Sequence, residues 1–398
     1  MPLLPPSPRK YRQILEQLQG EILRGDYRTG DKLPSEADLI KRFGASRITV
    51  GRAVNELRNL GLVERRAGSG TYVRPPASES RNADASANAA SASAGLLLFG
   101  LLIPDLGRTD IFEPICQGMA EAPQSDKFAL LWGHAPAAPI TREERAWQVC
   151  QRFIERGADG VFFAPFDQPL LHAEDNLRLL VALDEARIPV VLLDRDTLRF
   201  PRRSAHDLVG LDNRRAGYLA TEHLLRLGRK RIVFAAPADT AATVDARIAG
   251  YREALFAEEH PGAPSVQRFD PADATAIRQM LDGVNPDALV CANDRTAGQL
   301  MHGLQALGRR VPQDVALVGI DDVDYASLLP VPLTTVRQPT REIGAAAVAA
   351  MLERVRRPSG PPRDILLDGT LVVRASCGAK AGLPLSPELT GNGEFDGR

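Results

Sequence analysis

The stretch from Lys32 to Val73 constrains the fold more than any other part of the chain, because it encodes two helices, a tight turn and a hairpin in a fixed order. Ser35 followed by Asp38 is a capping-box start for a first helix, and Gly44 is a stop signal for it. Ser46 is the N-cap candidate of a second, longer helix. The apolar positions of that helix repeat at helical spacing: Val50, Val54, Leu57 and Leu60. The short turn between the helices has the length of a helix-turn-helix connection.

A hairpin is predicted directly after the second helix. Residues 62–66 and 71–73 read as strands, and Ala67-Gly68-Ser69-Gly70 reads as the turn between them. A helix-turn-helix followed by a hairpin is a winged helix. Upstream, residues 11–24 have the apolar spacing of an amphipathic helix that would pack across the helix-turn-helix.

The second helix is predicted to enter the major groove of DNA. Arg47, Ile48 and Thr49 fall in its first turn, where side chains reach base edges and phosphates. Arg65 and Arg66 on the hairpin would reach the DNA backbone or minor groove. The alternative is a helical hairpin with a solvated charged face. The capped first helix, the Ser-Arg start of the second helix and the Gly-Ser-Gly turn occur in order, which favours DNA binding.

This stretch resembles the DNA-binding domain of the gluconate-repressor (GntR) family of bacterial transcription regulators. The resemblance covers about the first 75 residues and rests on Leu33-Pro34-Ser35-Glu36, Ala45-Ser46-Arg47-Ile48-Thr49-Val50, Leu57, Gly61 and Gly68-Ser69-Gly70-Thr71-Tyr72-Val73. It implies DNA contacts from Ser35, Glu36, Ser46, Arg47, Ile48, Thr49, Arg52, Arg66, Gly68, Ser69 and Gly70. Gly51 and Ala37 stand where members of the family carry further DNA-contacting arginines, so the contacts are expected to be fewer or shifted to Arg52 and Arg66.

The charge of the chain is distributed unevenly. The net charge of the 398 residues is −1, whereas residues 1–75 carry +6 and the remainder −7. A basic small domain joined to an acidic large one suits DNA binding by the first domain only. The four cysteines are far apart and form no CxxC motif, so we expect buried, reduced thiols and no metal site. The N-terminus lacks the apolar core of a signal peptide, and we therefore expect a cytoplasmic protein without a membrane anchor.

The chain is predicted to divide into four parts. Residues 1–75 form the winged helix, and residues 76–95, rich in Ala, Ser and Asn, form a flexible linker. Residues 96–379 form a ligand-binding domain with two lobes, and residues 380–398 form a disordered tail.

The large domain is predicted to be α/β, because strand and helix patterns alternate from Leu97 to Gly319. Buried-strand runs begin near residues 97, 128, 160, 189, 208, 231, 288 and 315, with helical patterns between most of them. The span is too long for one sheet, so two lobes of doubly wound parallel sheets are expected.

Polar residues follow several of these strand runs. They are Asp105, Asp194-Arg195, Asp212-Asn213, Asn293-Asp294 and Asp321-Asp322. Ligands of open α/β sheets bind beyond the carboxyl ends of the strands. A single such residue reads as a turn or a helix cap, but the whole set indicates a site for a polyhydroxylated ligand. Phe163 and Phe166 near another strand end could line the cleft or pack in the core.

This half resembles the sugar-binding repressor and periplasmic binding-protein (LacI and ribose-binding-protein) family over nearly all of residues 97–378. The matching stretches are 188–195, 247–251, 293–294, 319–322 and 333–339. The resemblance implies effector contacts from Asp110, Phe112, Asp194, Arg195, Arg247, Asn293, Asp321 and Gln338. Phe112 is expected to be a stacking face for the ligand, although Thr109-Asp110-Ile111-Phe112 lacks one aromatic residue and one amide of the family's pattern. For Arg247, a helix-face ion pair is the alternative.

The sequence thus predicts a transcription regulator, and most simply a repressor. Two copies would bind a pseudo-palindromic DNA operator, and a monosaccharide or related polyol would control the affinity. One alternative is a DNA-binding domain fused to an enzyme that uses pyridoxal phosphate, but none of the few lysines of the large domain ends a strand. A transport-type binding protein is the other alternative, and the winged helix argues against it. No catalytic residue, metal or cofactor is expected.

Overall fold

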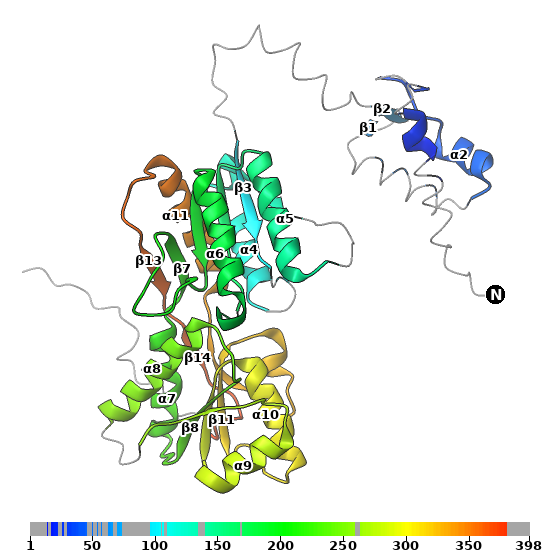
Figure 1. Cartoon of the computed structure of the whole chain (residues 1–398). Helices are drawn as coiled ribbons and strands as arrows, with labels where there is room; N and C mark the ends of the chain where they lie inside the picture. The colour runs from blue at the N-terminus through cyan, green and yellow to red at the C-terminus, as the bar shows by residue number, and fades with distance from the viewer. Residues whose placement is uncertain are drawn as a thin grey trace, which may run out of the picture. The chain divides into compact units, whose positions relative to one another are not determined.

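The computed structural model describes residues 14, 17–22, 26–27, 30–45, 50, 54, 57, 63–66, 70–73, 96–104, 106, 110–133, 140–167, 169–258 and 263–379. The chain divides into two compact units, Met1–Ala94 and Gly95–Arg398, which are described separately (Figure 1). The expected linker, residues 76–95, and the expected tail, residues 380–398, lie outside the described residues.

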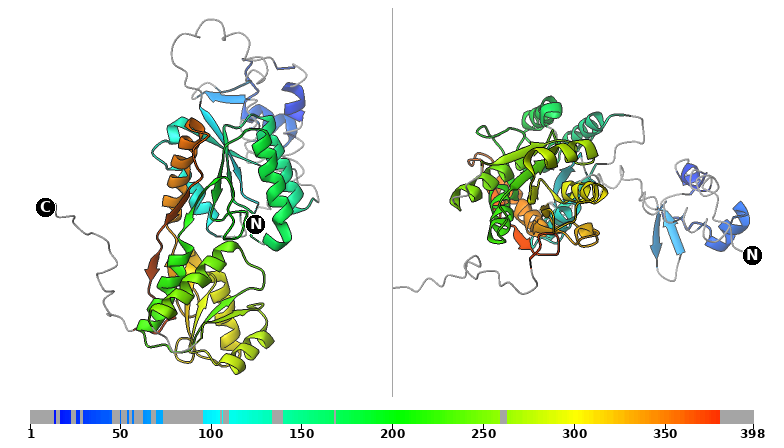
Figure 2. Two further views of the ribbon diagram at one scale, coloured as in Figure 1. Left: turned by 60° about the vertical axis from the view of Figure 1, so that its left-hand side comes forward. Right: turned by 90° about the horizontal axis from the view of Figure 1, so that it is seen from below.

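The first unit contains the expected helix and hairpin. Helix α2 (Glu36–Phe43) begins after Ser35, whose hydroxyl oxygen accepts a hydrogen bond from the backbone N–H of Asp38 at 3.2 Å. It ends at Gly44, where φ is +55°, a left-handed conformation that glycine adopts without steric cost. Strands β1 (Val63–Arg66) and β2 (Gly70–Val73) pair antiparallel (Figure 2). The predicted capping box, stop signal and hairpin are confirmed.

Apolar side chains from each of these elements form one core in the first unit. It contains Ile14, Leu18, Leu33, Leu39, Ala45, Val50, Leu57, Val63 and Val73. The helical spacing of Val50, Val54 and Leu57 is confirmed, since all three are helical and face or border this core.

The second unit contains two lobes. In lobe 1 the strands are β3 (Leu97–Leu102), β4 (Phe128–Trp132), β5 (Gly160–Phe163), β6 (Val190–Leu193), β7 (Asp207–Leu211) and β13 (Asp364–Leu367). They pair in parallel in the order β13-β7-β6-β5-β3-β4. The helices are α4 (Phe112–Ala120), α5 (Arg142–Glu155), α6 (Pro169–Glu185) and α11 (Thr340–Arg356), with a 3-10 turn η1 (Ser125–Lys127).

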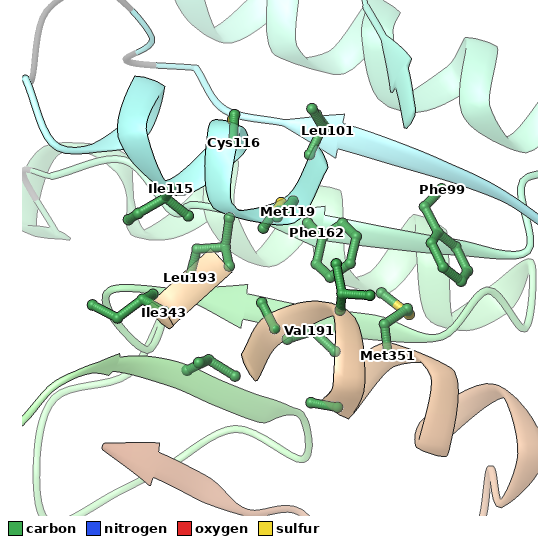
Figure 3. Packing of buried hydrophobic residues seen from close by; sticks show 14 of the residues in the cluster. Phe99, Leu101, Ile115, Cys116, Met119, Phe162, Val191, Leu193, Ile343 and Met351 are labelled. Atoms are coloured by element: carbon green, nitrogen blue, oxygen red, sulfur yellow. The ribbon is translucent and has the colours of Figure 1, made fainter. Parts of the chain in front are cut away.

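Two hydrophobic clusters cover the two faces of the lobe 1 sheet. One lies between the sheet and helices α4 and α11, where Phe99, Phe162 and Val191 meet Met119 and Met351 (Figure 3). The other lies between the sheet and helices α5 and α6. Coverage of both faces explains why the strands read as continuous apolar runs.

Lobe 2 repeats this architecture. Its strands are β8 (Ile232–Ala236), β9 (Ser265–Arg268), β10 (Ala288–Cys291), β11 (Ala316–Asp321), β12 (Thr334–Arg337) and β14 (Thr370–Val372), in the order β14-β12-β11-β10-β8-β9. Its helices are α7 (Asn213–Arg226), α8 (Ala242–Ala257), α9 (Ala274–Val284) and α10 (Asp294–Ala306), with η2 (Asp324–Ser327). The expectation of parallel pairing holds except at the edge, where β14 runs antiparallel to β12.

The chain passes between the lobes three times: from β7 to α7, from β12 to α11, and from β13 to β14 (Figure 1). Each lobe is therefore built from separate parts of the sequence. Because these connections are short, residues at the strand ends of one lobe lie next to those of the other.

Within the described residues, no helix is long and apolar enough to cross a membrane. Cys116, Cys150, Cys291 and Cys377 are buried and unpaired, as expected.

Candidate functional site

A polar cavity of about 370 Å³ lies between the two lobes of the second unit. Among the described residues, five aspartates and four arginines line it. Lobe 1 contributes Asp110, Ile111, Arg142, Asp167, Asp194 and Arg195. Lobe 2 contributes Pro237, Asp239, Thr240, Ala241, Thr243, Val244, Arg247, Ala292, Asn293, Arg295, Thr296, Gln299, Asp321 and Tyr325.

Asp321, the last residue of β11, is the most strongly perturbed acid in this cavity. Its Oδ1 accepts hydrogen bonds from Gln338 Nε2 at 2.6 Å and from Arg247 Nη2 at 3.5 Å. Burial raises the pKa of Asp321 to about 7, against the opposing effect of the Arg247 charge. The carboxylates of Asp294 and Asp194 raise it further. The cavity therefore has an acid that gains or loses its proton near neutral pH.

Arg247 is held in place by three groups from different elements. Its Nε donates to Asn213 Oδ1 at 2.8 Å, and its Nη1 donates to the carbonyl oxygen of Ala292 at 2.5 Å. The third partner is Asp321, and the side chain of Arg247 is only 5% exposed. Arg247 therefore forms the ion pair of the alternative reading and also lines the cavity, so its contact with an effector stays a prediction.

The position of Arg247 depends on the close packing of helices α7 and α8. A Cβ atom at Gly217 would lie 2.0 Å from the carbonyl oxygen of Arg247, and one at Gly250 would lie 1.8 Å from that of Arg214. Only glycine allows the two helices to approach this closely.

Asp294 supports the loop that follows Asp321. It is fully buried, with Oδ1 accepting from the Thr335 hydroxyl at 2.6 Å and Oδ2 accepting from the backbone N–H of Val323 at 3.1 Å. Burial raises the pKa of Asp294 to about 6. Asp294 is thus a second acid whose ionised form is disfavoured by burial. It lies beneath the cavity and is not part of its lining.

In lobe 1, Asp194 and Arg195 follow β6 and form a pair. Nε and Nη2 of Arg195 each lie 2.9 Å from Asp194 Oδ2. Asp194 has a φ of +67°, in the left-handed region that residues other than glycine adopt infrequently. Both side chains are nearly buried and line the cavity, as expected from the strand-end pattern.

The expected stacking role of Phe112 is corrected. Its ring is 1% exposed and packs in the lobe 1 core, and Phe112 does not line the cavity. The guanidinium of Arg195 lies over this ring, 5.8 Å from its centroid. Helix α4 begins at Phe112, which turns the ring inward, so Phe112 supports Arg195 from below.

The other expected effector residues lie at or near the cavity. Asp110 is exposed in its lining, and Asn293 lines it while its Oδ1 caps helix α10 by accepting from the N–H of Thr296 at 2.9 Å. Gln338 lies in an adjacent groove of about 900 Å³ that also contains Asp110, Asp321 and Tyr325. Within the described residues, the buried Oε1 of Gln338 has no hydrogen-bond partner.

Two further expectations from strand ends are resolved against a ligand role. Asp212 caps helix α7 by accepting from the N–H of Arg215 at 2.9 Å. Phe163 and Phe166 are buried in a hydrophobic core and do not line the cavity. Asp105 lies outside the described residues.

Several cavity residues were not expected from the sequence: Arg142, Asp167, Asp239, Thr240, Thr243, Arg295, Gln299 and Tyr325. Asp167 and Asp239 follow strands β5 and β8 after proline-containing turns, so the strand-end rule could have found them. Tyr325 comes from η2, and burial together with neighbouring carboxylates raises its pKa to about 12. Arg142 begins a helix and carries no such signal.

In the first unit, the structure describes four of the expected DNA-binding positions. Ser35 caps α2 and its hydroxyl donates to Asp38 Oδ2 at 2.6 Å, and Glu36 is the first residue of that helix. Arg66 ends β1 and Gly70 begins β2, at the two sides of the hairpin turn. Ser46, Arg47, Ile48, Thr49, Arg52, Gly68 and Ser69 lie outside the described residues.

Comparison with known protein families gives one match for each unit. Residues 10–73 match the model of the bacterial regulatory proteins of the gntR family, and residues 221–377 match a periplasmic binding protein-like domain.

The chain is similar to curated transcription regulators. It is 27% identical to the arabinose metabolism transcriptional repressor of Geobacillus stearothermophilus, over 92% of this chain and 97% of that repressor. It is 34% identical to the transcriptional regulator CelR of Thermobifida fusca, over 52% of this chain and 61% of that protein.

Solved structures with the same fold include ligand complexes. A CelR–cellobiose complex matches with a TM-score of 0.57 and 25% identity, over 92% of this chain and 98% of that one. A LacI family regulator from Enterococcus faecium with bound ribose matches with a TM-score of 0.56 and 25% identity, over 70% of this chain and 98% of that one. The chain is thus a transcription regulator that joins a GntR-type helix-turn-helix domain to a periplasmic-binding-protein-like domain.

Proposed function

We propose that this regulator is a repressor whose affinity for operator DNA is controlled by a monosaccharide or related polyol bound between the two lobes of its large domain. The polar cavity is the observation that carries the proposal. Its volume of about 370 Å³ lies within the range of small-molecule sites, roughly 300–1,000 Å³.

The lining suits a ligand with many hydroxyl groups. Each hydroxyl donates one hydrogen bond and accepts others, whereas a carboxylate only accepts and a guanidinium only donates. The cavity presents both kinds of group from both lobes: Asp194 and Arg195 from lobe 1, and Asp321 and Arg247 from lobe 2. An analogue without the hydroxyls would leave these buried groups unpaired and bind weakly.

The names of similar proteins suggest which sugars to test. Two repressors that this chain matches over nearly their whole length are named for arabinose metabolism, and similar solved structures hold ribose or cellobiose. We propose an aldose of this kind as the effector, with arabinose as the first candidate.

Control would operate through the relative position of the lobes. A sugar that contacts both lobes binds the closed arrangement better than an open one, and so shifts the population toward closure. We propose that two copies bind a pseudo-palindromic operator through residues 1–75, and that closure changes how the two DNA-binding domains are held. The protein would act in the cytoplasm, and bound sugar would be released unchanged.

A calorimetric titration of the full-length protein with arabinose, ribose and cellobiose tests the proposal. At least one sugar is expected to bind, and Asp321→Ala is expected to abolish that binding. Failure of all three sugars to bind, or unchanged binding by Asp321→Ala, would contradict the proposed site.

A further inference from the structure

One corner of the interlobe cavity contains a residue that neither the strand-end pattern nor the family resemblance indicated. Arg142, the first residue of α5, lines the cavity from lobe 1. Asp167 lines the same cavity and follows Phe166, on whose ring Arg142 lies. A cationic donor and an anionic acceptor are therefore offered to the ligand from adjacent parts of lobe 1.

Arg142 is held by contacts on two sides. Its Nη2 lies 2.9 Å from Nε2 of His172, and its guanidinium carbon lies 4.9 Å from the centroid of the Phe166 ring. The imidazole of His172 itself packs on Phe166, with ring centroids 4.8 Å apart. Glu143 Oε1 lies 3.6 Å from Nε of Arg142. These contacts fix the direction of the guanidinium before any ligand binds.

His172 reaches Arg142 from an interruption in helix α6. The residue has φ −117° and ψ 20°, which are not helical values, and its side chain is 7% exposed. Its backbone therefore departs from the helix at the position where the imidazole contacts α5.

The contact with Arg142 determines the protonation of His172. A guanidinium can only donate hydrogen bonds, so Nε2 of His172 must accept and carries no proton. The proton is then on Nδ1, which lies 3.3 Å from Asp175 Oδ2 and 3.5 Å from Glu143 Oε1. A second proton on Nε2 would remove the acceptor and bring two cations into contact.

We propose that Arg142 is a specificity-determining residue that donates to effector hydroxyls, and that His172 is a positioning residue which holds Arg142 by accepting its hydrogen bond. The inference rests on the proposed function. Arg142 would supply from α5 the lobe 1 donor that the segment 109–112 lacks. Effector binding should then depend on an acceptor at position 172 as well as on Arg142 itself.

The first test compares two arginines on the same helix. The affinities of the full-length protein for arabinose, ribose and cellobiose are measured by calorimetry at about pH 7.5. Loss of a charge-assisted hydrogen bond in Arg142→Ala should weaken binding of the bound sugar roughly tenfold or more. Arg145→Ala is the matched control, because Arg145 is an exposed residue of α5 that does not line the interlobe cavity. Equal affinities of Arg142→Ala and wild type would overturn the proposal.

The second test separates positioning from a structural role. His172→Gln keeps an acceptor for Arg142 and should bind sugar as wild type does. His172→Phe removes the acceptor and should bind sugar weakly. Equal sugar affinities of His172→Phe and wild type would contradict the role of His172.

The outcomes distinguish this inference from the proposed function. If wild type and Arg142→Ala bind a sugar with equal affinity, the proposed function is supported and only the role of Arg142 is contradicted. A wild-type protein that binds none of the three sugars contradicts both. If His172→Phe does not fold, sugar affinity equal to wild type in His172→Gln would support the role of His172, and weak sugar binding by a folded His172→Gln protein would contradict it.

Discussion

At the scale of single residues, the cavity is defined by charged groups that are buried in pairs. Arg195 pairs with Asp194 and Arg247 with Asp321, so each lobe contributes a partly neutralised pair. Removing the arginine of such a pair leaves a buried carboxylate without its cation, which costs more than the pair contributes, whereas Arg247 has two further acceptors besides Asp321. Two predictions follow from the lobe 2 pair.

Replacing Asp321 should change how the stability of the protein depends on pH. Its pKa is about 7 in the folded protein and ordinarily 3.8, so the folded state binds more protons than the unfolded state between these values. The stability that Asp321 contributes is present below its ordinary pKa and is lost as the pH rises through 7. Asp321→Asn should therefore be more stable than wild type at about pH 8. Its unfolding free energy should also decrease less than that of wild type between about pH 4 and 8.

Urea unfolding across this pH range measures the unfolding free energy of both proteins and its dependence on pH. Asp294, whose pKa is about 6, leaves some slope in the variant. An unchanged slope would show that Asp321 is ionised throughout.

Arg247→Ala should destabilise the protein by about 3–5 kcal/mol, because the change removes the donor to the carbonyl oxygen of Ala292 and the cation that faces the carboxylate of Asp321, which keeps its hydrogen bond from Gln338. In the double variant with Asp321→Asn the loss should be smaller than the sum of the two single effects. Denaturant unfolding of the three variants measures this coupling. If the two changes in unfolding free energy add up to that of the double variant, the 3.5 Å contact between Arg247 and Asp321 contributes nothing to stability.

Residues at this scale are predictable from the sequence where the backbone alone determines their position. The carboxyl ends of β6 and β11 place Asp194, Arg195 and Asp321 at the edges of their two sheets that face the cavity. The stacking role predicted for Phe112 is wrong, because the direction of its ring depends on where helix α4 begins. Arg142 was not predicted, because its place in the cavity depends on how α5 packs against α6.

At the scale of elements, glycine positions in helices fix the spacing of the helix pairs. Helices α4 and α11 meet at Gly118 and Gly344, where an added Cβ would lie 2.1 Å from a backbone oxygen of the other helix. Helices α7 and α8 meet in the same way at Gly217 and Gly250. The packing of α7 against α8 affects the cavity more directly, because Arg247 is a residue of α8.

Gly250→Ala should therefore destabilise the protein by about 1–3 kcal/mol, since the added methyl group forces α7 and α8 apart. It should also weaken sugar binding, because Arg247 moves away from Asn213. Gly283→Ala in helix α9 is the matched control, because nothing lies within 4 Å of its added Cβ. The control should be as stable as wild type or slightly more stable. Thermal unfolding and calorimetry test the pair, and an unaffected Gly250→Ala protein would contradict the packing argument.

The elements that the sequence predicted well have a clear apolar period or an apolar run with turns on both sides. Strands such as β4 and β10 match their predicted ranges. Helix α11 was not predicted, since its run of alanines and valines is buried around much of its circumference and has little amphipathic period. The short edge strands β13 and β14 were also missed. They are only partly buried, and the antiparallel pairing of β14 depends on the last crossing between the lobes.

At the scale of the whole molecule, the two lobes share a cavity, and within the described residues three short crossings of the chain join them. Such connections permit rotation of one lobe against the other with few changes in backbone angles. A ligand that contacts both lobes can therefore control their relative position. The division into two lobes could be predicted from chain length, but the order of the crossings required the positions of α11 and β12–β14.

The most direct test of control by the interlobe cavity is the affinity of the full-length protein for operator DNA with and without sugar. The operator duplex is selected by the protein from random DNA, and the sugar is saturating arabinose or whichever of the tested sugars binds. We expect the sugar to weaken DNA binding by roughly 5- to 150-fold, the usual range of allosteric coupling. Asp321→Ala should bind DNA but not respond to sugar, and Arg47→Ala should bind sugar but not DNA. Equal DNA affinities in the presence and absence of a sugar that demonstrably binds would contradict the claim that the interlobe cavity controls DNA binding.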